Sequence, residues 1–99
     1  MIKVEVTKEH ISILGHAMYD DYGKDIVCAA ASGIVMTSVE SIASIDESSI
    51  DVKQTQDKLE IIINKHNDIT NKLIKTMVNL LTELEKKYPE NIKITNKEE

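Results

Sequence analysis

The segment GHAMYDDYGKDIVCAAAS, residues 15–32, decides how this chain folds. Its first part is polar and is bounded by Gly15 and Gly23, a composition typical of a loop. Its second part begins with Asp25, a residue favoured just before the first turn of a helix, and continues into an apolar, alanine-rich run. The segment therefore predicts a loop that leads into the first turn of a buried helix.

The apolar residues that follow have the spacing of a helix. Over residues 26–45 they recur every three or four positions in two adjacent stripes, which predicts a helix buried over much of its surface. A second helix is predicted over residues 69–88, where the same spacing continues until Pro89 ends it. We expect Asn67 or Asp68 to cap the start of this second helix.

Alternation of apolar and polar residues predicts the strands. Residues 2–6 and 11–13 predict a hairpin, residues 50–52 and 59–63 predict a second pair of strands, and residues 92–94 predict a short last strand. The predicted order is therefore β-β-α-β-β-α-β. Because the strands and helices each have one apolar side, we expect an α+β fold in which a small sheet packs against two helices.

Length and composition restrict the class of protein. The 99 residues predict a single domain over residues 1–99, and a domain of this size gains stability from self-association. A net charge of −5 argues against a nucleic-acid partner, because phosphate contacts need clustered Lys and Arg. No stretch approaches roughly 18 apolar residues, and the N-terminus lacks the apolar region of a signal peptide, so we expect no membrane span. A single cysteine suits a reducing compartment, which favours the cytoplasm.

Cys28, the only cysteine, has two interpretations. Free cysteine is often buried and packs as a small hydrophobic residue. If Asp25 caps the helix, however, Cys28 occupies the third helical position, where the helix dipole and free N–H groups favour a thiolate and can hold an oxyanion. His16 lies across the loop and suits proton transfer near neutral pH. The residues alone leave both interpretations open: a nucleophile with its base, or a core thiol.

Metal and cofactor chemistry is not expected. A zinc site needs three or four ligands, and the spacing of Cys28, His10, His16 and His66 fits no CxxC or HxxxH pattern. The glycines do not form a phosphate-binding loop. We expect His10 to be a turn residue and His66 to lie at the surface or at a helix cap.

Two blocks of the chain resemble a known family. GHA at residues 15–17, followed by a short acidic loop, Gly23 and DIVCAAAS at residues 25–32, closely resembles the ribosomal-processing cysteine protease family. The blocks match at a fixed spacing in a chain of similar length. The resemblance implies a cytoplasmic, homodimeric endopeptidase whose substrate is the precursor of a large-subunit ribosomal protein. Such enzymes remove a short N-terminal extension after a hydrophobic segment that ends in aromatic residues.

The resemblance also implies roles for individual residues. Cys28 matches the catalytic nucleophile and His16 the catalytic histidine, which would act as general base. Asp25 and Ser32 match positions that support the site. Asp25 could cap the helix or orient His16, and capping needs only local geometry.

Two further expectations concern the loop and the rival function. Gly15 and Gly23 would act as hinges that let the loop open and close over a peptide. The alternative function is a non-catalytic, dimeric α+β module that binds a ribosomal protein or peptide, with Cys28 as part of its core.

Overall fold

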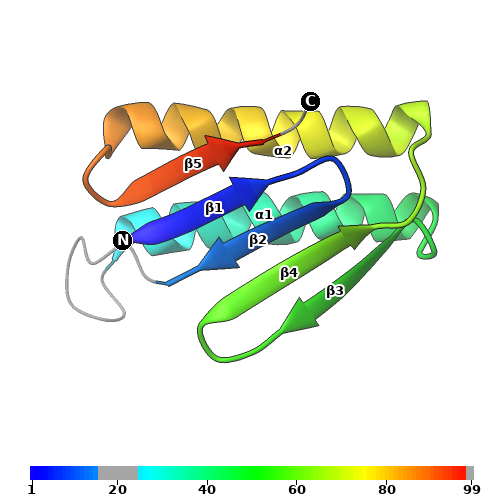
Figure 1. The fold of residues 1–99 in the computed structure, drawn as a ribbon, viewed down its shortest axis with the longest axis horizontal. Coiled ribbons are helices and arrows are strands. Elements are labelled where there is room, and N and C mark those ends of the chain that lie inside the picture. Colours follow the sequence, from blue (N-terminus) through cyan, green and yellow to red (C-terminus); the bar gives the residue numbers. More distant parts are fainter. Residues whose placement is uncertain (16–24, 98–99) are drawn as a thin grey trace.

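The computed structural model describes residues 1–15 and 25–97. The predictions for His16, for Gly23 and for the loop between them lie outside the described residues. The described residues form five strands and two helices in the predicted order (Figure 1). These elements are β1 (Ile2–Val6), β2 (His10–Leu14), α1 (Ile26–Ile45), β3 (Ile50–Gln54), β4 (Lys58–Ile63), α2 (Asp68–Lys87) and β5 (Ile92–Asn96).

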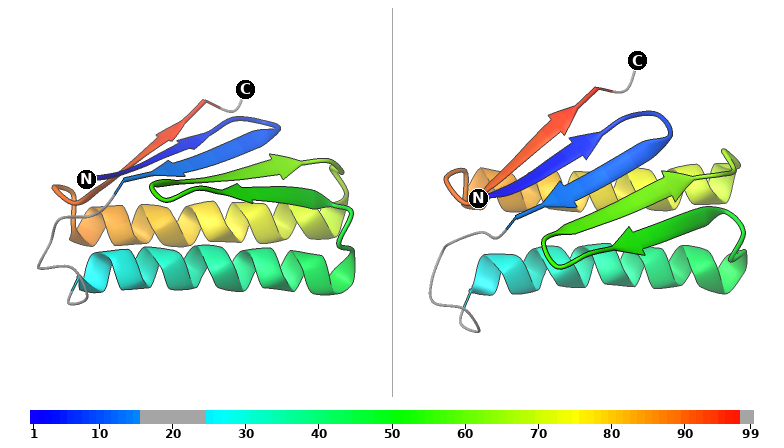
Figure 2. Two further views of the ribbon diagram at one scale, coloured as in Figure 1. Left: turned by 90° about the horizontal axis from the view of Figure 1, so that it is seen from below. Right: turned by 60° about the horizontal axis from the view of Figure 1, so that its bottom comes forward.

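The strands form one sheet with the order β3-β4-β2-β1-β5. All neighbouring strands are antiparallel except β1 and β5, which are parallel. Both helices lie on the same face of this sheet, side by side and running in opposite directions (Figure 2). The expected α+β fold, with a small sheet packed against two helices, is confirmed.

Alternating side chains explain which face of the sheet the helices cover. In β1 the apolar Ile2, Val4 and Val6 are buried, whereas the residues between them are exposed. The register pairs Val4 with Ile13 of β2, so the apolar side chains of both strands share the covered face. The predicted hairpin is confirmed although its turn contains no glycine.

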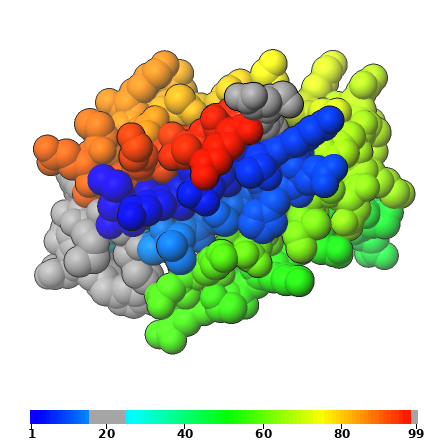
Figure 3. Space-filling view, viewed as in Figure 1, coloured from blue at the N-terminus to red at the C-terminus, as the bar shows by residue number. Residues whose placement is uncertain are grey.

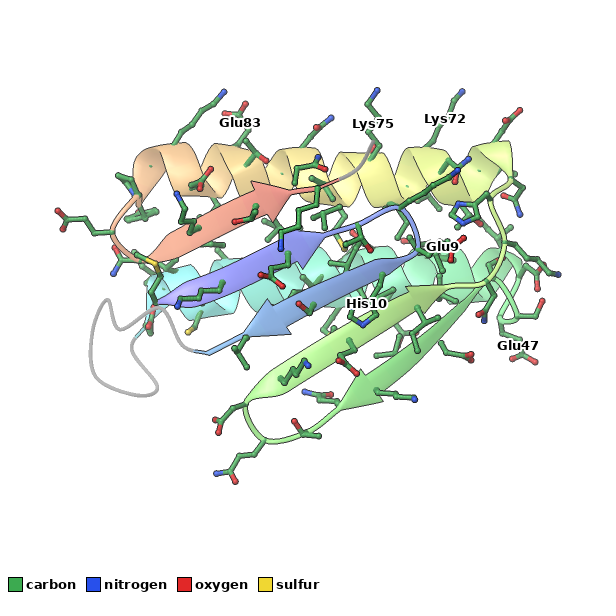
Figure 4. All side chains as sticks on the ribbon, viewed as in Figure 1. Glu9, His10, Glu47, Lys72, Lys75 and Glu83 are labelled. Atoms are coloured by element: carbon green, nitrogen blue, oxygen red, sulfur yellow. The ribbon has the colours of Figure 1, made fainter. Side chains whose placement is uncertain are left out.

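The opposite face of the sheet is polar. Figure 3 views the molecule from this face, where strand residues form the centre of the surface. His10 lies here and approaches Glu60 at 3.6 Å (Figure 4), while the Lys58 ammonium lies 2.7 Å from the same carboxylate. The hydrogen bond from Lys58 lowers the pKa of the Glu60 carboxyl, and the positive charges nearby act in the same direction. The expectation that His10 is a turn residue is wrong, because His10 is the first residue of β2 and lies beside Glu60 on the polar face of the sheet.

Side-chain caps begin both helices. The side chain of Asn67 accepts a hydrogen bond from the Thr70 N–H at 2.9 Å, so Asn67 is the N-cap of α2. Asp68 lies in the first turn and Lys86 and Lys87 in the last, which matches the charge preference of the helix dipole. The described structure thus settles the expected cap in favour of Asn67.

Helix α1 is buried along one stripe, which follows the predicted stripe from Val27 to Val39 and also includes Ile42 from the adjacent predicted stripe. The buried residues are Val27, Ala31, Val35, Val39 and Ile42. They join side chains of β1, β2, β4 and α2, including Met77 and Leu81, in one core. At the ends of the helix, Ile26 and Ile45 are 52% and 57% exposed, although the other stripe was expected to bury them.

Helix α1 is also long and apolar enough to cross a membrane, which the sequence analysis did not anticipate. It has 20 residues and a mean hydropathy of 1.7. Core helices that pack against a sheet meet the same criterion. In this structure 28% of the apolar window is buried, and the buried stripe of α1 belongs to the common core.

Candidate active site

The site begins with the cap of α1. Asp25 has extended backbone angles, and its Oδ1 accepts hydrogen bonds from the N–H groups of Val27 at 3.0 Å and Cys28 at 2.9 Å. Val27 is fully buried, so the first turn is fixed from below by packing and from its end by the cap. Among the described residues, Asp25 therefore acts as the cap of α1. Whether Asp25 also orients His16 stays a prediction.

Cys28 occupies the third position of α1, as predicted. Its side chain is half-buried: it packs against the margin of the core and also lines a cavity. The Cys28 side chain therefore combines the partial burial expected of a core thiol with the access to a cavity expected of a nucleophile. A thiol that is neither enclosed in the core nor fully solvated can be reached by a substrate.

The cavity has a volume of about 760 Å³ and lies between the first three turns of α1 and the hairpin of β3 and β4. Cys28, Ser32 and Met36 follow one another at intervals of four residues and form its helical wall. Its floor is apolar and its rim is polar. The floor includes Ile13, Ala31, Val35 and Leu59, and the rim includes Gln54, Thr55, Gln56, Asp57 and Lys58.

The end of β2 closes another side of the cavity. Gly15 has φ = +90°, and a Cβ atom at this position would lie 2.7 Å from the Met1 carbonyl oxygen, so only glycine fits without strain. Its N–H donates a hydrogen bond to the Asp57 carbonyl at 3.0 Å. Gly15 and Asp25 both line the cavity. Gly15 and Asp25, the described residues that precede and follow residues 16–24, thus both line the cavity that contains Cys28.

The four described site residues come together in this cavity. Gly15, Asp25, Cys28 and Ser32 all line it, although nine residues separate the first two. The hinge role of Gly15 and the supporting role of Ser32 remain predictions. The sequence analysis missed the rim of the hairpin, which carries no motif and reaches the site only through the folding of the sheet.

One expectation about the first turn is not supported. The N–H groups of Val27 and Cys28 donate to the Asp25 carboxylate, and the Ala29 N–H donates to the Asp25 carbonyl at 3.1 Å. These groups cannot also hold an oxyanion in this conformation. An oxyanion at Cys28 needs other donors, or a movement of the Asp25 side chain.

Metal ligands do not cluster in the part of the chain that the structure describes. No group of three or more His, Cys, Asp or Glu side chains is placed to hold a metal ion within residues 1–15 and 25–97. His10 lies on the polar sheet face, and His66 lies at a second cavity beside α2. The described histidines are thus remote from the wall that contains Cys28.

Comparison of the sequence with known proteins identifies a family of cysteine proteases. Residues 1–93 match the family described as "Cysteine protease Prp". The chain is 33% identical over 86 residues to the ribosomal processing cysteine protease Prp of Staphylococcus aureus strain Mu50. This match covers 84% of the chain and 81% of its relative.

Solved structures give the same result at the level of the fold. A crystal structure of the S. aureus ribosomal processing protease Prp with a covalently linked product peptide matches with a TM-score of 0.92. It has 30% sequence identity, and the match covers 98% of this chain and 100% of the other. A structure of the S. aureus protease with a substrate peptide matches with a TM-score of 0.85 at 29% identity, again over 98% of this chain and 100% of the other.

Proposed function

The chain belongs to the Prp family of ribosomal processing cysteine proteases, and from this premise we propose that it removes the N-terminal extension of a large-subunit ribosomal protein. The observation that carries the proposal is the position of Cys28, in the capped first turn of α1 and on the wall of a peptide-sized cavity. The S. aureus relative of the same fold has been solved with a product peptide covalently linked. A covalent intermediate on Cys28 is the corresponding chemistry here.

The mechanism uses Cys28 as the nucleophile and His16 as the general base. His16 takes the proton of the thiol, and the thiolate sulfur attacks the carbonyl carbon of the scissile peptide bond. The C–N bond breaks, the amine leaves with the proton from His16, and the acyl group remains on sulfur as a thioester. His16 then activates water, which hydrolyses the thioester and restores the thiol. No metal or cofactor takes part in this scheme.

The supporting roles follow from local contacts. Asp25 holds the first turn of α1 by accepting from the N–H groups of Val27 and Cys28. Ser32 lies one turn beyond Cys28 on the same wall of the cavity, where its hydroxyl is available to a bound peptide. We propose that Gly15 and Gly23 act as hinges for the segment between them.

The protein is further proposed to act as a homodimer in the cytoplasm, with no nucleic acid or membrane as partner. Four large apolar side chains on the two helices are about half exposed, namely Ile26, Ile45, Ile69 and Leu80. Single exposed apolar side chains are common on protein surfaces, so the dimer proposal rests mainly on the small size of this 99-residue domain, which gains stability from self-association. Sedimentation of the purified protein at several concentrations tests the dimer: a mass that stays at one chain would contradict it.

The non-catalytic binding module is the weaker alternative, because the family consists of cysteine proteases. The test is to mix the purified protein with precursors of the large-subunit ribosomal proteins of its own organism and to identify the fragments by mass spectrometry. We expect one precursor to lose its N-terminal extension. Cleavage should vanish in Cys28→Ala while the circular dichroism spectrum persists. Binding of a precursor without any cleavage would instead support the module.

A further inference from the structure

The two edge strands of the sheet, β3 and β5, differ in whether their outward backbone groups are covered. At one edge, the Ile94 N–H of β5 donates a hydrogen bond to the Glu85 carboxylate of α2 at 2.9 Å. Because a helix side chain satisfies this backbone group, another strand cannot pair there without displacing it. The β5 edge is therefore covered by the protein itself.

The β3 edge is open among the described residues. The Thr55 N–H donates to the Lys58 carbonyl, and the Asn64 N–H donates to the Ser49 carbonyl. These bonds show which residues of β3 direct their backbone groups toward β4. In an antiparallel pair the backbone groups alternate in direction, so those of Val52 and Gln54 point away from β4. Every residue of β3 after Ile50 is exposed.

This open edge continues into the cavity that contains Cys28. β3 forms the border of the sheet and runs toward the end of the molecule where α1 begins (Figures 1 and 2). Its last residue, Gln54, lines the cavity together with Cys28. A strand laid along β3 would thus lead into the cavity that Cys28 lines.

The side chains along this border suit an extended apolar peptide. Val52 is 39% exposed and Met36, on the cavity wall of α1, is 42% exposed. Alternate side chains of an added strand would face the helix layer and cover apolar surface of this kind. Asp51 and Lys53 alternate with these positions, and charged residues on an edge strand oppose pairing between copies of the sheet.

We propose that the substrate binds as an added strand along the free edge of β3, with its backbone paired to Val52 and Gln54 and its scissile bond at Cys28. The inference rests on the proposed protease function and deepens it, since it assigns how the peptide is held. Backbone pairing supplies affinity for any extended segment, and the apolar floor of the cavity selects the side chains next to the cut.

The enzyme variant that tests this is Val52→Pro, with Val52→Ala as its matched control. Proline removes the outward N–H while the bonds from β3 to β4 are kept, and proline is tolerated on edge strands. The substrate is a quenched-fluorescence peptide that spans the N-terminal extension and first mature residues of the cleaved precursor. We expect kcat/KM to fall at least about tenfold further in Val52→Pro than in Val52→Ala, because Val52→Ala removes only the side-chain contact and keeps the outward N–H. Equal cleavage by the two variants overturns the inference.

A second measurement keeps the test valid if Val52→Pro does not fold. The wild-type protein is given peptides that carry a single N-methyl group at successive backbone positions away from the scissile bond. Pairing along an edge predicts losses of about tenfold at alternate positions and little change between them. Uniform tolerance of N-methylation would overturn the added strand.

The outcomes separate this inference from the function on which it rests. If the wild-type protein cleaves no precursor, the proposed function fails. If it cleaves and loses the activity in Cys28→Ala, yet tolerates both Val52→Pro and N-methylation, only the added strand fails. A change of sedimentation mass in Val52→Pro alone would show that the β3 edge joins two copies of the chain, which also overturns the inference.

Discussion

The two helices have the same length and cap type but differ in what their exposed sides carry. In α2 most of the exposed side chains are charged or polar, with Lys72, Lys75 and Glu83 projecting away from β5 (Figure 4), although Ile69 and Leu80 are about half exposed. In α1 the surface beside the buried stripe is apolar or small and forms the wall of a cavity. The comparison indicates that α2 packs in the core and covers the β5 edge, whereas α1 packs in the core and also forms the wall of the cavity that contains Cys28.

The largest expected effect concerns the thiol on α1. Cys28→Ala removes the proposed nucleophile, so kcat/KM should fall by at least about a thousandfold. Because the side chain is only half-buried, the melting temperature should change by no more than a few degrees. Peptide cleavage and thermal unfolding, measured on the same sample, check both statements. An active Cys28→Ala variant would remove the distinction between the helices.

The next effect concerns the core side of α2. Met77 is fully buried, so Met77→Ala should lower the free energy of unfolding by about 2–5 kcal/mol. Lys72→Ala, on the charged side, should change it by less than about 0.5 kcal/mol. Urea unfolding gives both values. The comparison would be wrong if the exposed substitution were as costly as the buried one.

The two caps provide a matched pair with a smaller effect. Asp25→Ala and Asn67→Ala should each lower the free energy of unfolding by about 1 kcal/mol, because each removes the acceptor for N–H groups of a first turn. Only Asp25→Ala should also lower kcat/KM, by about tenfold to a hundredfold, since Cys28 lies in that turn.

Asp25→Asn serves as the control for charge. It keeps an acceptor at the cap, so its stability should stay near that of the wild type. If it is also fully active, Asp25 acts as a cap alone and does not orient His16. Loss of activity in Asn67→Ala as well would show that the caps do not differ in function.

The smallest effect concerns the C-terminal end of α1. Hydrogen bonds from Ser48 and Lys65 lower the pKa of the Asp46 carboxyl from 3.8 to about 2. A carboxyl with a lowered pKa stabilises the fold in its ionised form, so the contribution is complete above about pH 4 and is lost as the pH falls through about 2. Asp46→Asn should therefore melt slightly lower than wild type at pH 7.

The pH dependence provides the check on Asp46. Because the Asp46 carboxyl is exposed, the difference in melting temperature between wild type and Asp46→Asn should be small. Thermal melts at a series of pH values from 5 downward should show this difference shrinking as the wild-type carboxyl is protonated. A difference that stays constant over this range would assign the effect to something other than ionisation.

Local patterns predicted the elements of the fold better than their assembly. Alternation in β1 and the capped periodic run of α2 are properties of neighbouring residues, and both appear where the sequence indicated. The position of Cys28 was also predictable, because Asp25 fixes the start of α1. The order of strands in the sheet depends on contacts between distant segments, and so does the parallel pairing of β5 with β1.

In the site, too, the features set by neighbouring residues were predictable, and those set by contacts between distant segments were not. The wall made by Cys28 and Ser32 follows from helical spacing alone. The hairpin residues opposite, such as Gln54 and Asp57, reach the cavity only because β3 and β4 border the sheet beside α1. From the sequence, the N–H groups of the first turn were expected both to donate to Asp25 and to hold an oxyanion. In the structure they donate to Asp25, which leaves them unable to serve an oxyanion at the same time.

The most direct test of this account is the rate at which iodoacetamide alkylates Cys28 as a function of pH. An accessible thiol that shares its proton with His16, as proposed, should react in the folded protein, with half-maximal rate well below the ordinary thiol pKa of about 8.5. Reaction only after addition of denaturant, or a midpoint at or above 8.5, would contradict the claim that α1 carries the nucleophile.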